Sequence, residues 1–239
     1  MHAVILAGGK GTRLAPYTKI FPKPMMPIGD KAILEILLHQ LKAAGINHVT
    51  LIVGHLSGLM RAYFQDGSQY GLDIQYAYED FPLGTAGPLA NITHLTNTFL
   101  VANGDVLSLI PIDELIQFHK DNQGICTIAM HERAVKIDLG VIEMDDCCRV
   151  TDYIEKPTIN YRVSMGLYVF EPRVLDYIPK GEYLDFPDLV KKLLAAGEQV
   201  NGFPYGGYWQ DLGHPADYEQ AVEDFDSLKH LFLPNEKKD

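Results

Sequence analysis

Glycines and cations are concentrated near the start of the chain, where residues 4–27 read VILAGGKGTRLAPYTKIFPKPMMP. Three glycines within four positions, Gly8, Gly9 and Gly11, let the backbone approach a bulky ligand closely. Successive free N–H groups in such a loop form an anion-binding concavity. Arg13 follows the loop, and Lys23 stands between two prolines. This combination predicts a site for a nucleoside triphosphate.

The alternative interpretation of the glycine loop is a simple turn after a strand. Neither G-x-x-x-x-G-K-[ST] nor G-x-G-x-x-G with a later acidic residue, the two common phosphate-loop patterns, occurs here. The charge distribution favours a ligand site. Through Lys31 the chain has five Lys or Arg residues and one acid, whereas its formal net charge is −11. A basic segment in an acidic protein indicates a small anion bound in one place.

Two carboxylates follow predicted strands. Asp105 ends an apolar strand, and Asp211 stands between a strand and a turn. Ligands of open parallel sheets bind beyond the carboxyl ends of the strands, and Mg²⁺ takes one or two carboxylates together with substrate phosphates and waters. We therefore expect Asp105 and Asp211 to hold Mg²⁺; the alternative for Asp105 is an Asx turn.

A second charged group, Glu155-Lys156-Pro157, ends another predicted strand. A carboxylate suits sugar hydroxyls, and the neighbouring ammonium suits a monophosphate as a point charge. The alternative is an exposed charged turn. Gly140 and Gly166 interrupt strands, which often marks a bulge or the close approach of a ligand.

A second glycine loop, residues 83–88, follows Glu79 by four residues and precedes a predicted helix. Its amides, including those at Gly84 and Thr85, could face a base or a phosphate, or the loop could be only a turn with a helix cap. The histidines show no metal-ligand spacing, although His214 stands near Asp211.

Composition bounds the class of protein. The 239 residues, 47% hydrophobic and 21% charged, suit one sizeable α/β domain. The acidic balance argues against a nucleic-acid partner, and no apolar run is long enough to span a membrane. The three cysteines lack a C-x-x-C motif, and no leader precedes the first predicted strand. These features predict a cytoplasmic protein.

Strand-like and helix-like segments alternate in the first half, which predicts a mostly parallel sheet with helices on both faces. The expected strands are 2–6, 49–53, 74–78 and 98–102, and the expected helices are 32–44, capped by Asp30 and ended by Gly45, 59–64, 88–95 and 112–120.

Shorter strands in the second half predict an antiparallel or mixed extension of this sheet. The expected strands are 126–131, 140–144, 150–155, 165–170, 199–204 and 208–211, and the expected helices are 173–177, 186–196, capped by Asp185, and 215–229. No linker or repeat interrupts the chain. We therefore expect one domain, 1–239, with a nucleotide-binding first half and an acceptor-binding second half.

The spacing of the motif from Gly8 to Pro27 resembles the signature of the sugar-1-phosphate nucleotidyltransferases, or nucleotide-sugar pyrophosphorylases. The motifs around Asp105, Glu155 and Asp211 follow in the family's order. The resemblance implies a Rossmann-like mixed α/β fold and Mg²⁺-dependent nucleotidyl transfer from an NTP to a sugar 1-phosphate, with release of pyrophosphate.

The resemblance also implies residue roles. Arg13 and Lys23 would be catalytic, and Asp105 and Asp211 would bind the metal. The expected nucleotide-binding residues are Leu6, Ala7, Gly8, Gly9, Gly11, Thr12, Arg13, Glu79, Gly84 and Thr85. The expected sugar-phosphate-binding residues are Asn103, Gly140, Glu155, Lys156 and Gly166.

The base and the sugar are harder to predict. Residues 82–89 resemble the mannose-1-phosphate guanylyltransferase branch, and a carboxylate such as Glu79 can accept both the N1–H and the amino group of guanine. We expect a short enzyme of this kind, without the C-terminal β-helix of the long family members, acting on GTP and a mannose- or heptose-type 1-phosphate. A homo-oligomer is also compatible with the family.

The alternatives are a uridylyl-, thymidylyl- or cytidylyltransferase on another sugar phosphate, and a non-catalytic regulatory subunit that binds nucleotide sugars. Such a subunit could discard its catalytic cations or carboxylates. Arg13, Lys23, Asp105 and Asp211 are all present, which favours the enzyme.

Overall fold

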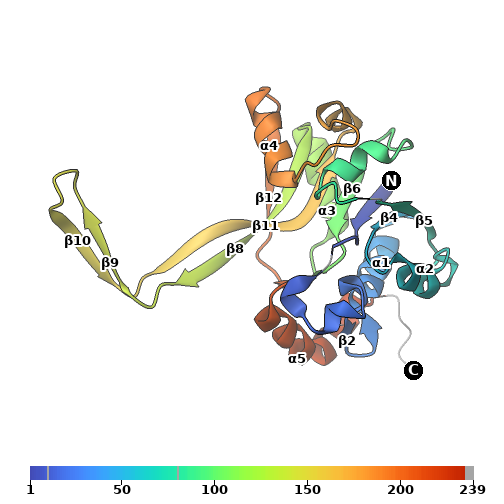
Figure 1. The fold of residues 1–239 in the computed structure, drawn as a ribbon, viewed down its shortest axis with the longest axis horizontal. Helices are drawn as coiled ribbons and strands as arrows, with labels where there is room; N and C mark the ends of the chain where they lie inside the picture. The colour runs from blue at the N-terminus through green and yellow to red at the C-terminus, as the bar shows by residue number, and fades with distance from the viewer. Residues whose placement is uncertain (10, 80, 235–239) are drawn as a thin grey trace.

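The computed structural model describes residues 1–9, 11–79 and 81–234 of the chain. These residues form a central seven-stranded sheet in the order β12-β8-β11-β6-β1-β4-β5 (Figure 1). Its neighbouring strands are parallel except at the two pairs that involve β11. The predicted Rossmann-like, mostly parallel sheet in a single domain is therefore confirmed. The strands are β1 (His2–Leu6), β4 (His48–Val53), β5 (Asp73–Tyr78), β6 (Phe99–Asn103), β8 (Cys126–Lys136), β11 (Thr158–Phe170) and β12 (Val200–Pro204).

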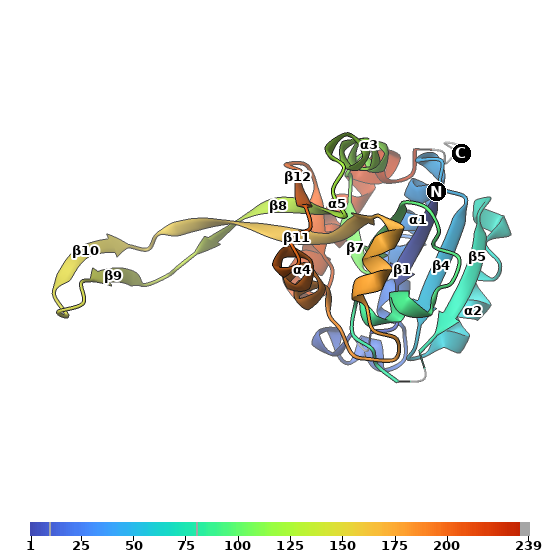
Figure 2. The same cartoon turned by 90° about the horizontal axis from the view of Figure 1, so that it is seen from above.

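Helices cover both faces of the sheet, because its central strands are apolar on both sides. In β1, the fully buried Ala3 and Ile5 pack into the cluster that includes α1, α2 and α3, whereas Val4 packs into the cluster of α4. Figure 2 shows α3 and α4 on opposite sides of the sheet. These helices are α1 (Ile33–Ala43), α2 (Ser57–Phe64), α3 (Ile112–Asn122) and α4 (Phe186–Ala195).

The C-terminal helix, α5 (Pro215–Phe232), brings the end of the described chain back to its beginning. Its Phe225 and Phe232 form a third core cluster with Ile28 and with Ile33 and Ile36 of α1. Two-stranded ladders flank this cluster: β2 (Pro27–Ile28) with β3 (Lys31–Ala32), and β7 (Val106–Ser108) with β13 (Trp209–Asp211). The second ladder joins the segment before α5 to the end of β6.

Two expected α-helices are 3₁₀ turns. Segments of one or two turns are marginal as α-helices, and 3₁₀ geometry commonly serves such short connectors. Residues 88–95 overlap η5 (Gly87–Asn91), and residues 173–177 lie in η6 (Pro172–Tyr177). The other 3₁₀ turns are η1 (Thr12–Leu14), η2 (Tyr17–Lys19), η3 (Lys23–Met25) and η4 (Ser68–Tyr70).

Of the two predicted ends of α1, the C-terminal end is correct and the N-terminal cap is wrong. Gly45 ends the helix with φ +78°, the left-handed conformation that glycine adopts freely. Asp30 does not cap its start, because the N-cap residue is Ala32. The Asp30 carboxylate instead pairs with Lys229 of α5 at 2.8 Å.

A long two-stranded ribbon leaves the body of the molecule (Figures 1 and 2). Strands β8 and β11 continue beyond the predicted ranges 126–131 and 165–170, and their far ends lead into a hairpin of β9 (Gly140–Met144) and β10 (Val150–Glu155). The extension of β8 and β11 was not predicted, although Ile159, Tyr161 and Val163 alternate with polar residues along β11. We call residues 134–163 the arm.

Within the ranges that the structure describes, no helix combines the length and the apolar character needed to cross a membrane.

Candidate nucleotide site

A cleft of about 840 Å³ opens where β1 and β6 end. Its lining comes from the first glycine loop, the ends of β1, β4 and β6, the loop after β5, and the segment before α4. Of the predicted residues, those lining the cleft are Leu6, Ala7, Gly8, Gly9, Gly11, Arg13, Lys23, Glu79, Gly84, Thr85, Asn103 and Asp105. This position matches the ligand-binding edge of open α/β sheets.

The glycine loop packs too closely for side chains at two of its positions. Gly11 has φ +60°, and a Cβ there would lie 2.8 Å from the Thr18 methyl carbon. Thr18 also donates its hydroxyl to the Gly11 carbonyl at 2.7 Å, which fixes the turn. A Cβ on Gly8 would lie 2.6 Å from Glu79 Oε2. The side chain of Thr12 lies outside the part of the structure that is described.

Lys23 is the best-buried cation of the site. It begins η3 after Pro22, is only 7% exposed, and donates a hydrogen bond from Nζ to Asp105 Oδ2. Asp105 follows β6 through Gly104, whose N–H donates to the Leu6 carbonyl at 2.9 Å. The ends of β1 and β6 are thereby joined, and the Lys23–Asp105 pair lies at their edge.

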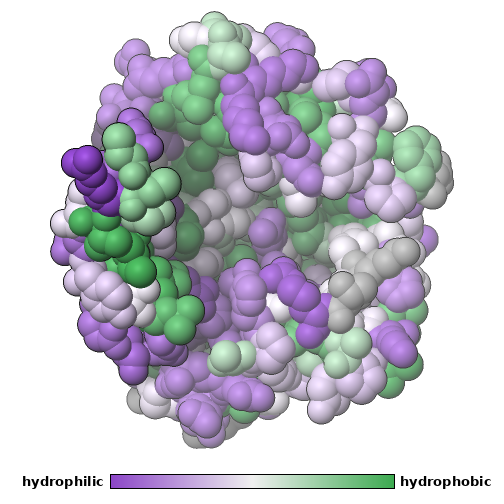
Figure 3. Space-filling view, turned by 60° about the vertical axis from the view of Figure 1, so that its left-hand side comes forward, coloured by the Kyte–Doolittle hydropathy of each residue, from purple (hydrophilic) through white to green (hydrophobic). Residues whose placement is uncertain are grey.

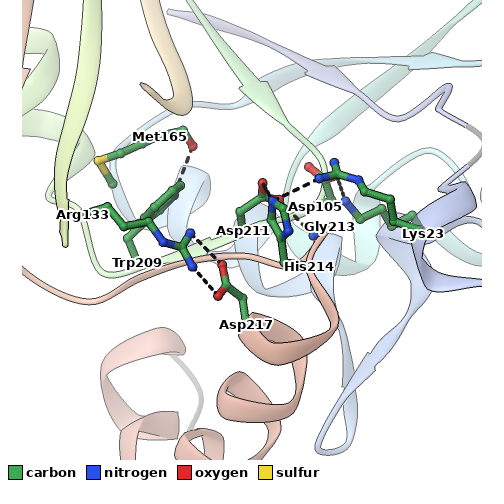
Figure 4. Close-up of polar contacts among 10 residues, drawn as sticks. Lys23, Asp105, Arg133, Met165, Trp209, Asp211, Gly213, His214 and Asp217 are labelled. Carbon is green, nitrogen blue, oxygen red and sulfur yellow. Dashed lines mark hydrogen bonds and ion pairs between the residues drawn. The ribbon is translucent and has the colours of Figure 1, made fainter. Parts of the chain in front are cut away.

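Asp211 reaches the same place from the other end of the chain. In the β13–β7 ladder it lies opposite Val106, the neighbour of Asp105. Its Oδ1 accepts the Gly213 N–H at 2.9 Å, and the Leu212 N–H donates to the Asp105 carbonyl at 3.2 Å. Figure 4 shows Asp105, Asp211 and Gly213 gathered beside Lys23. The segments that carry Asp105 and Asp211 are therefore joined to each other by backbone hydrogen bonds.

Gly213 is the point on which these groups converge. A Cβ added there would lie 2.7 Å from Arg13 Nη2, 2.7 Å from Lys23 Nζ and 2.9 Å from Asp211 Oδ1. Both predicted catalytic cations and one predicted metal carboxylate thus surround a single glycine. Gly213 follows Asp211 by two positions in the sequence, but this spacing gives no indication of the crowding.

His214 links the cation of the glycine loop to Asp211. Its Nε2 lies 3.1 Å from Arg13 Nη1 and 3.6 Å from Asp211 Oδ2. We expected His214 only to stand near Asp211. The contact with Arg13, 201 positions earlier in the chain, was not predicted, because no local spacing signals it.

Glu79, which follows β5, lines the cleft beside the glycine loop. Burial raises the pKa of Glu79 above its usual range, although a hydrogen bond from the Leu83 N–H, 3.2 Å from Oε1, opposes this. Gly84 has φ +78°, and a Cβ there would lie 2.5 Å from the Leu184 carbonyl oxygen. The wall is therefore a tightly packed loop that presents one carboxylate.

Asp185 is a cleft residue that sequence reasoning assigned only to a helix cap. It is the N-cap residue of α4, but its side chain makes no capping hydrogen bond. Its Oδ1 accepts the Thr85 N–H at 2.9 Å and the Thr85 hydroxyl at 3.1 Å. Tyr183 donates to Oδ2 at 2.7 Å, and both residues line the cleft.

Three predicted sugar-phosphate residues are not brought to this cleft. Gly140 pairs with Glu155 in the β9–β10 hairpin, and Lys156 follows directly, so all three lie on the arm. Gly166 differs, because it lies where β11 meets the body: a Cβ there would be 2.6 Å from Asn103 Nδ2. Within a single chain, only Asn103 and Gly166 of this predicted set lie at the site.

The carboxylates at the ends of β6 and β13 fit a magnesium ion. One oxygen of each is held by a protein donor, Lys23 for Asp105 and the Gly213 N–H for Asp211, which fixes both carboxyl groups. Among the described residues, no group of three or more His, Cys, Asp or Glu side chains could hold a metal ion by itself. This donor set matches Mg²⁺, which completes its shell with substrate phosphates and water.

Comparison with known proteins supports this assignment of the fold and the motif. The chain is 39% identical over 232 residues to mannose-1-phosphate guanylyltransferase from Mycobacterium tuberculosis, covering 94% of this chain and 64% of that protein. It is 34% identical to UTP–glucose-1-phosphate uridylyltransferase from Synechocystis, covering 98% of this chain and 66% of that protein. The chain thus spans slightly less than two thirds of the length of these curated relatives.

Among solved structures, HddC from Yersinia pseudotuberculosis superimposes with a TM-score of 0.71 and 26% identity, covering 94% of this chain and 99% of that one. Residues 2–227 match the nucleotidyl transferase family. The glycine loop, the carboxylates at the strand ends and the mixed α/β sheet therefore have a common explanation, and the chain belongs to the nucleotidyl transferase family.

Proposed function

We propose that this chain transfers a nucleoside monophosphate from an NTP to a sugar 1-phosphate, giving an NDP-sugar and pyrophosphate. The observation that carries the proposal is the convergence of Arg13, Lys23 and Asp211 on Gly213, beside Asp105. Cations and metal-binding carboxylates at one point are what transfer at a phosphorus atom requires. A non-catalytic binding subunit could discard these cations and carboxylates, whereas this chain has them all.

In the proposed reaction, an oxygen of the sugar 1-phosphate attacks the α-phosphorus in line. The bond from the α-phosphorus to the bridging oxygen breaks, and its electron pair leaves with pyrophosphate. No covalent enzyme intermediate is needed. The chain contributes by holding the two anions in contact and by neutralising the charge between them.

Each residue has a role in this reaction. The amides of the glycine loop and Arg13 bind the triphosphate. Lys23, buried and held in place by Asp105, presents its ammonium to the α-phosphate. Asp105 and Asp211 would hold Mg²⁺, which, when bound, neutralises phosphate charge and aligns the leaving group. His214 orients the Arg13 guanidinium through its 3.1 Å contact.

We propose GTP as the preferred nucleotide and a mannose- or heptose-type 1-phosphate as the acceptor. Glu79 is the group that supports guanine, since a carboxylate can accept two adjacent N–H donors. Glu79 Oε2 lies against Gly8, 2.6 Å from the position that a Cβ would take, so the carboxylate stands beside the glycine loop. The three free thiols fit a reducing compartment, the cytoplasm, in which we place the reaction.

The test is turnover with Mg²⁺ and each of GTP, UTP, dTTP, CTP and ATP against a panel of sugar 1-phosphates, read as released pyrophosphate. GTP should give the highest kcat/KM. Preference for another nucleotide would overturn the guanine assignment alone. Absence of turnover across the panel, with nucleotide binding retained, would overturn catalysis in favour of a binding subunit.

A further inference from the structure

The arm has no core of its own. All 30 of its residues are described, and none of them is buried. Isolated two-stranded hairpins are at best marginally stable in water. Eight large apolar side chains on the arm are exposed, with Leu139 at 73% and Met144 at 62%; the others are Val135, Ile142, Val150, Tyr153, Ile154 and Tyr161. Figure 3 turns the arm toward the viewer. Hydrophobic side chains gather at the left of this view. A surface of this kind needs a covering partner.

The root of the arm is held firmly in its outward direction. Strands β8 and β11 pair without interruption from Met130–Ser164 to Lys136–Thr158. Arg133 binds Asp217 of α5 through two hydrogen bonds, of 2.6 and 3.0 Å, and its guanidinium lies over the Trp209 ring (Figure 4). Folding the arm back onto its own body would break these contacts. The covering surface must therefore come from another molecule.

The arm is acidic, and the segment that carries the first glycine loop is basic. Residues 134–163 contain six acidic and four basic residues, whereas the segment through Lys31 contains five basic residues and one acid. The same segment exposes Tyr17, Ile20 and Phe21, and Phe81 and Tyr183 are exposed on the lining of the cleft. The segment through Lys31 thus complements the arm in charge, and the exposed apolar side chains beside the cleft complement those of the arm.

The cleft of one chain lacks groups that the proposed acceptor requires. Arg13 and Lys23 are the Lys and Arg side chains among its described lining residues, and Lys23 is paired with Asp105. Binding two phosphorylated substrates in one cleft requires further positive charge to balance their phosphate groups. Lys156 is exposed on the arm, with φ +47°, a conformation that costs energy for a side chain of this size and often marks functional positions.

We propose that two copies of this chain exchange arms, so that the arm of each copy covers the cleft of the other and supplies Glu155 and Lys156 to its sugar-phosphate subsite. The arrangement is a two-fold dimer, because each copy gives one arm and receives one. The proposal rests on the proposed function for the roles of Glu155 and Lys156, but the exchange of arms can be measured without it.

The mass of the protein in solution tests the exchange directly. Light scattering of the purified chain should give a dimer of about 53 kDa, since each chain is 26.7 kDa. Ile142→Asp, on the arm and 52% exposed, should shift the mass to that of a monomer. The matched control is Leu59→Asp on α2, which is 41% exposed and distant from the arm, and it should stay dimeric. A monomeric wild-type chain, or an Ile142→Asp variant that remains fully dimeric, would overturn the exchange.

Mixing two inactive variants tests whether the site is shared. Lys23→Ala disables the cleft and Lys156→Ala disables the arm, so each variant alone should lose most turnover. After the two are unfolded and refolded together, random pairing gives one intact site in each mixed dimer, or about one quarter of wild-type activity. Lys23→Ala mixed with Asp105→Asn, both in the cleft, should recover nothing. If the first mixture also stays inactive, or if Lys156→Ala alone is fully active, the arm does not complete the partner's site.

The two proposals fail in different ways. If the wild-type chain shows no turnover but is a dimer that Ile142→Asp dissociates, the exchange holds and the proposed function fails. If the wild-type chain turns over as a monomer, the proposed function holds and the exchange fails. Circular dichroism of every variant verifies that loss of activity or mass is not loss of folding.

Discussion

Replacing Gly213 by alanine should damage catalysis while leaving the fold intact. The added Cβ would lie 2.7 Å from both Arg13 Nη2 and Lys23 Nζ, whereas ordinary contacts between such atoms lie at about 3.5 Å. Both cations must therefore move by about 0.8 Å. Because the moving atoms are the ends of long side chains and Gly213 does not have a positive φ, stability should change little. A displacement of about 1 Å costs about 100-fold in rate, or about 2.7 kcal/mol of transition-state stabilisation.

The assay is kcat/KM for pyrophosphate release by Gly213→Ala, measured together with a thermal melt. Gly206→Ala is the matched control, because it makes the same chemical change seven residues earlier, where a Cβ would meet no atom within 4 Å. We expect a loss of about 100-fold in the first variant and near-native activity in the second. Near-native activity in Gly213→Ala would show that Arg13 and Lys23 do not act at the point where the structure gathers them.

Asp105→Asn and Lys23→Ala should each abolish turnover without a large change in Tm; near-native activity in either variant would refute its assigned role. Glu79→Gln should lower kcat/KM for GTP by about 100-fold while sparing UTP, because an amide, with a single acceptor oxygen, cannot accept both guanine donors as a carboxylate can; an unchanged ratio between the two nucleotides would remove Glu79 from base recognition. Burial, together with the neighbouring histidines, lowers the pKa of His2 from 6.5 to about 4. As the pH falls, His2 is therefore protonated at a higher pH in the unfolded chain than in the folded chain. The free energy of unfolding should therefore drop between pH 6.5 and 4 by about 1–2 kcal/mol more in the wild-type chain than in His2→Gln, and identical pH profiles in urea titrations would contradict this.

The first half of the site could be predicted because its residues obey local rules. Gly11 needs a positive φ, Gly8 sits where a side chain would collide with Glu79, and Lys23 is framed by prolines. The apolar run of β1 identified a buried strand before the glycine loop. Signals of this kind depend on residues within a few positions of one another, so they can be recognised from the sequence alone.

The remainder depends on contacts between distant parts of the chain. Asp211 meets Asp105 only because β13 pairs with β7, a three-residue ladder with no periodicity to reveal it. Asp185 has the sequence position of a helix cap, yet its carboxylate binds Thr85, 100 positions earlier. The direction of the arm depends on Arg133 binding Asp217, a choice among partners that residue types alone do not determine.

The central claim is that the cleft at the ends of β1 and β6 joins a nucleotide to a sugar phosphate. The most direct measurement is mass spectrometry of the products after the chain is incubated with Mg²⁺, GTP and mannose or heptose 1-phosphate. The account predicts an NDP-sugar and pyrophosphate in equal amounts, dependent on both Lys23 and Asp105. Nucleotide binding without either product, for every NTP and sugar 1-phosphate offered, would contradict it.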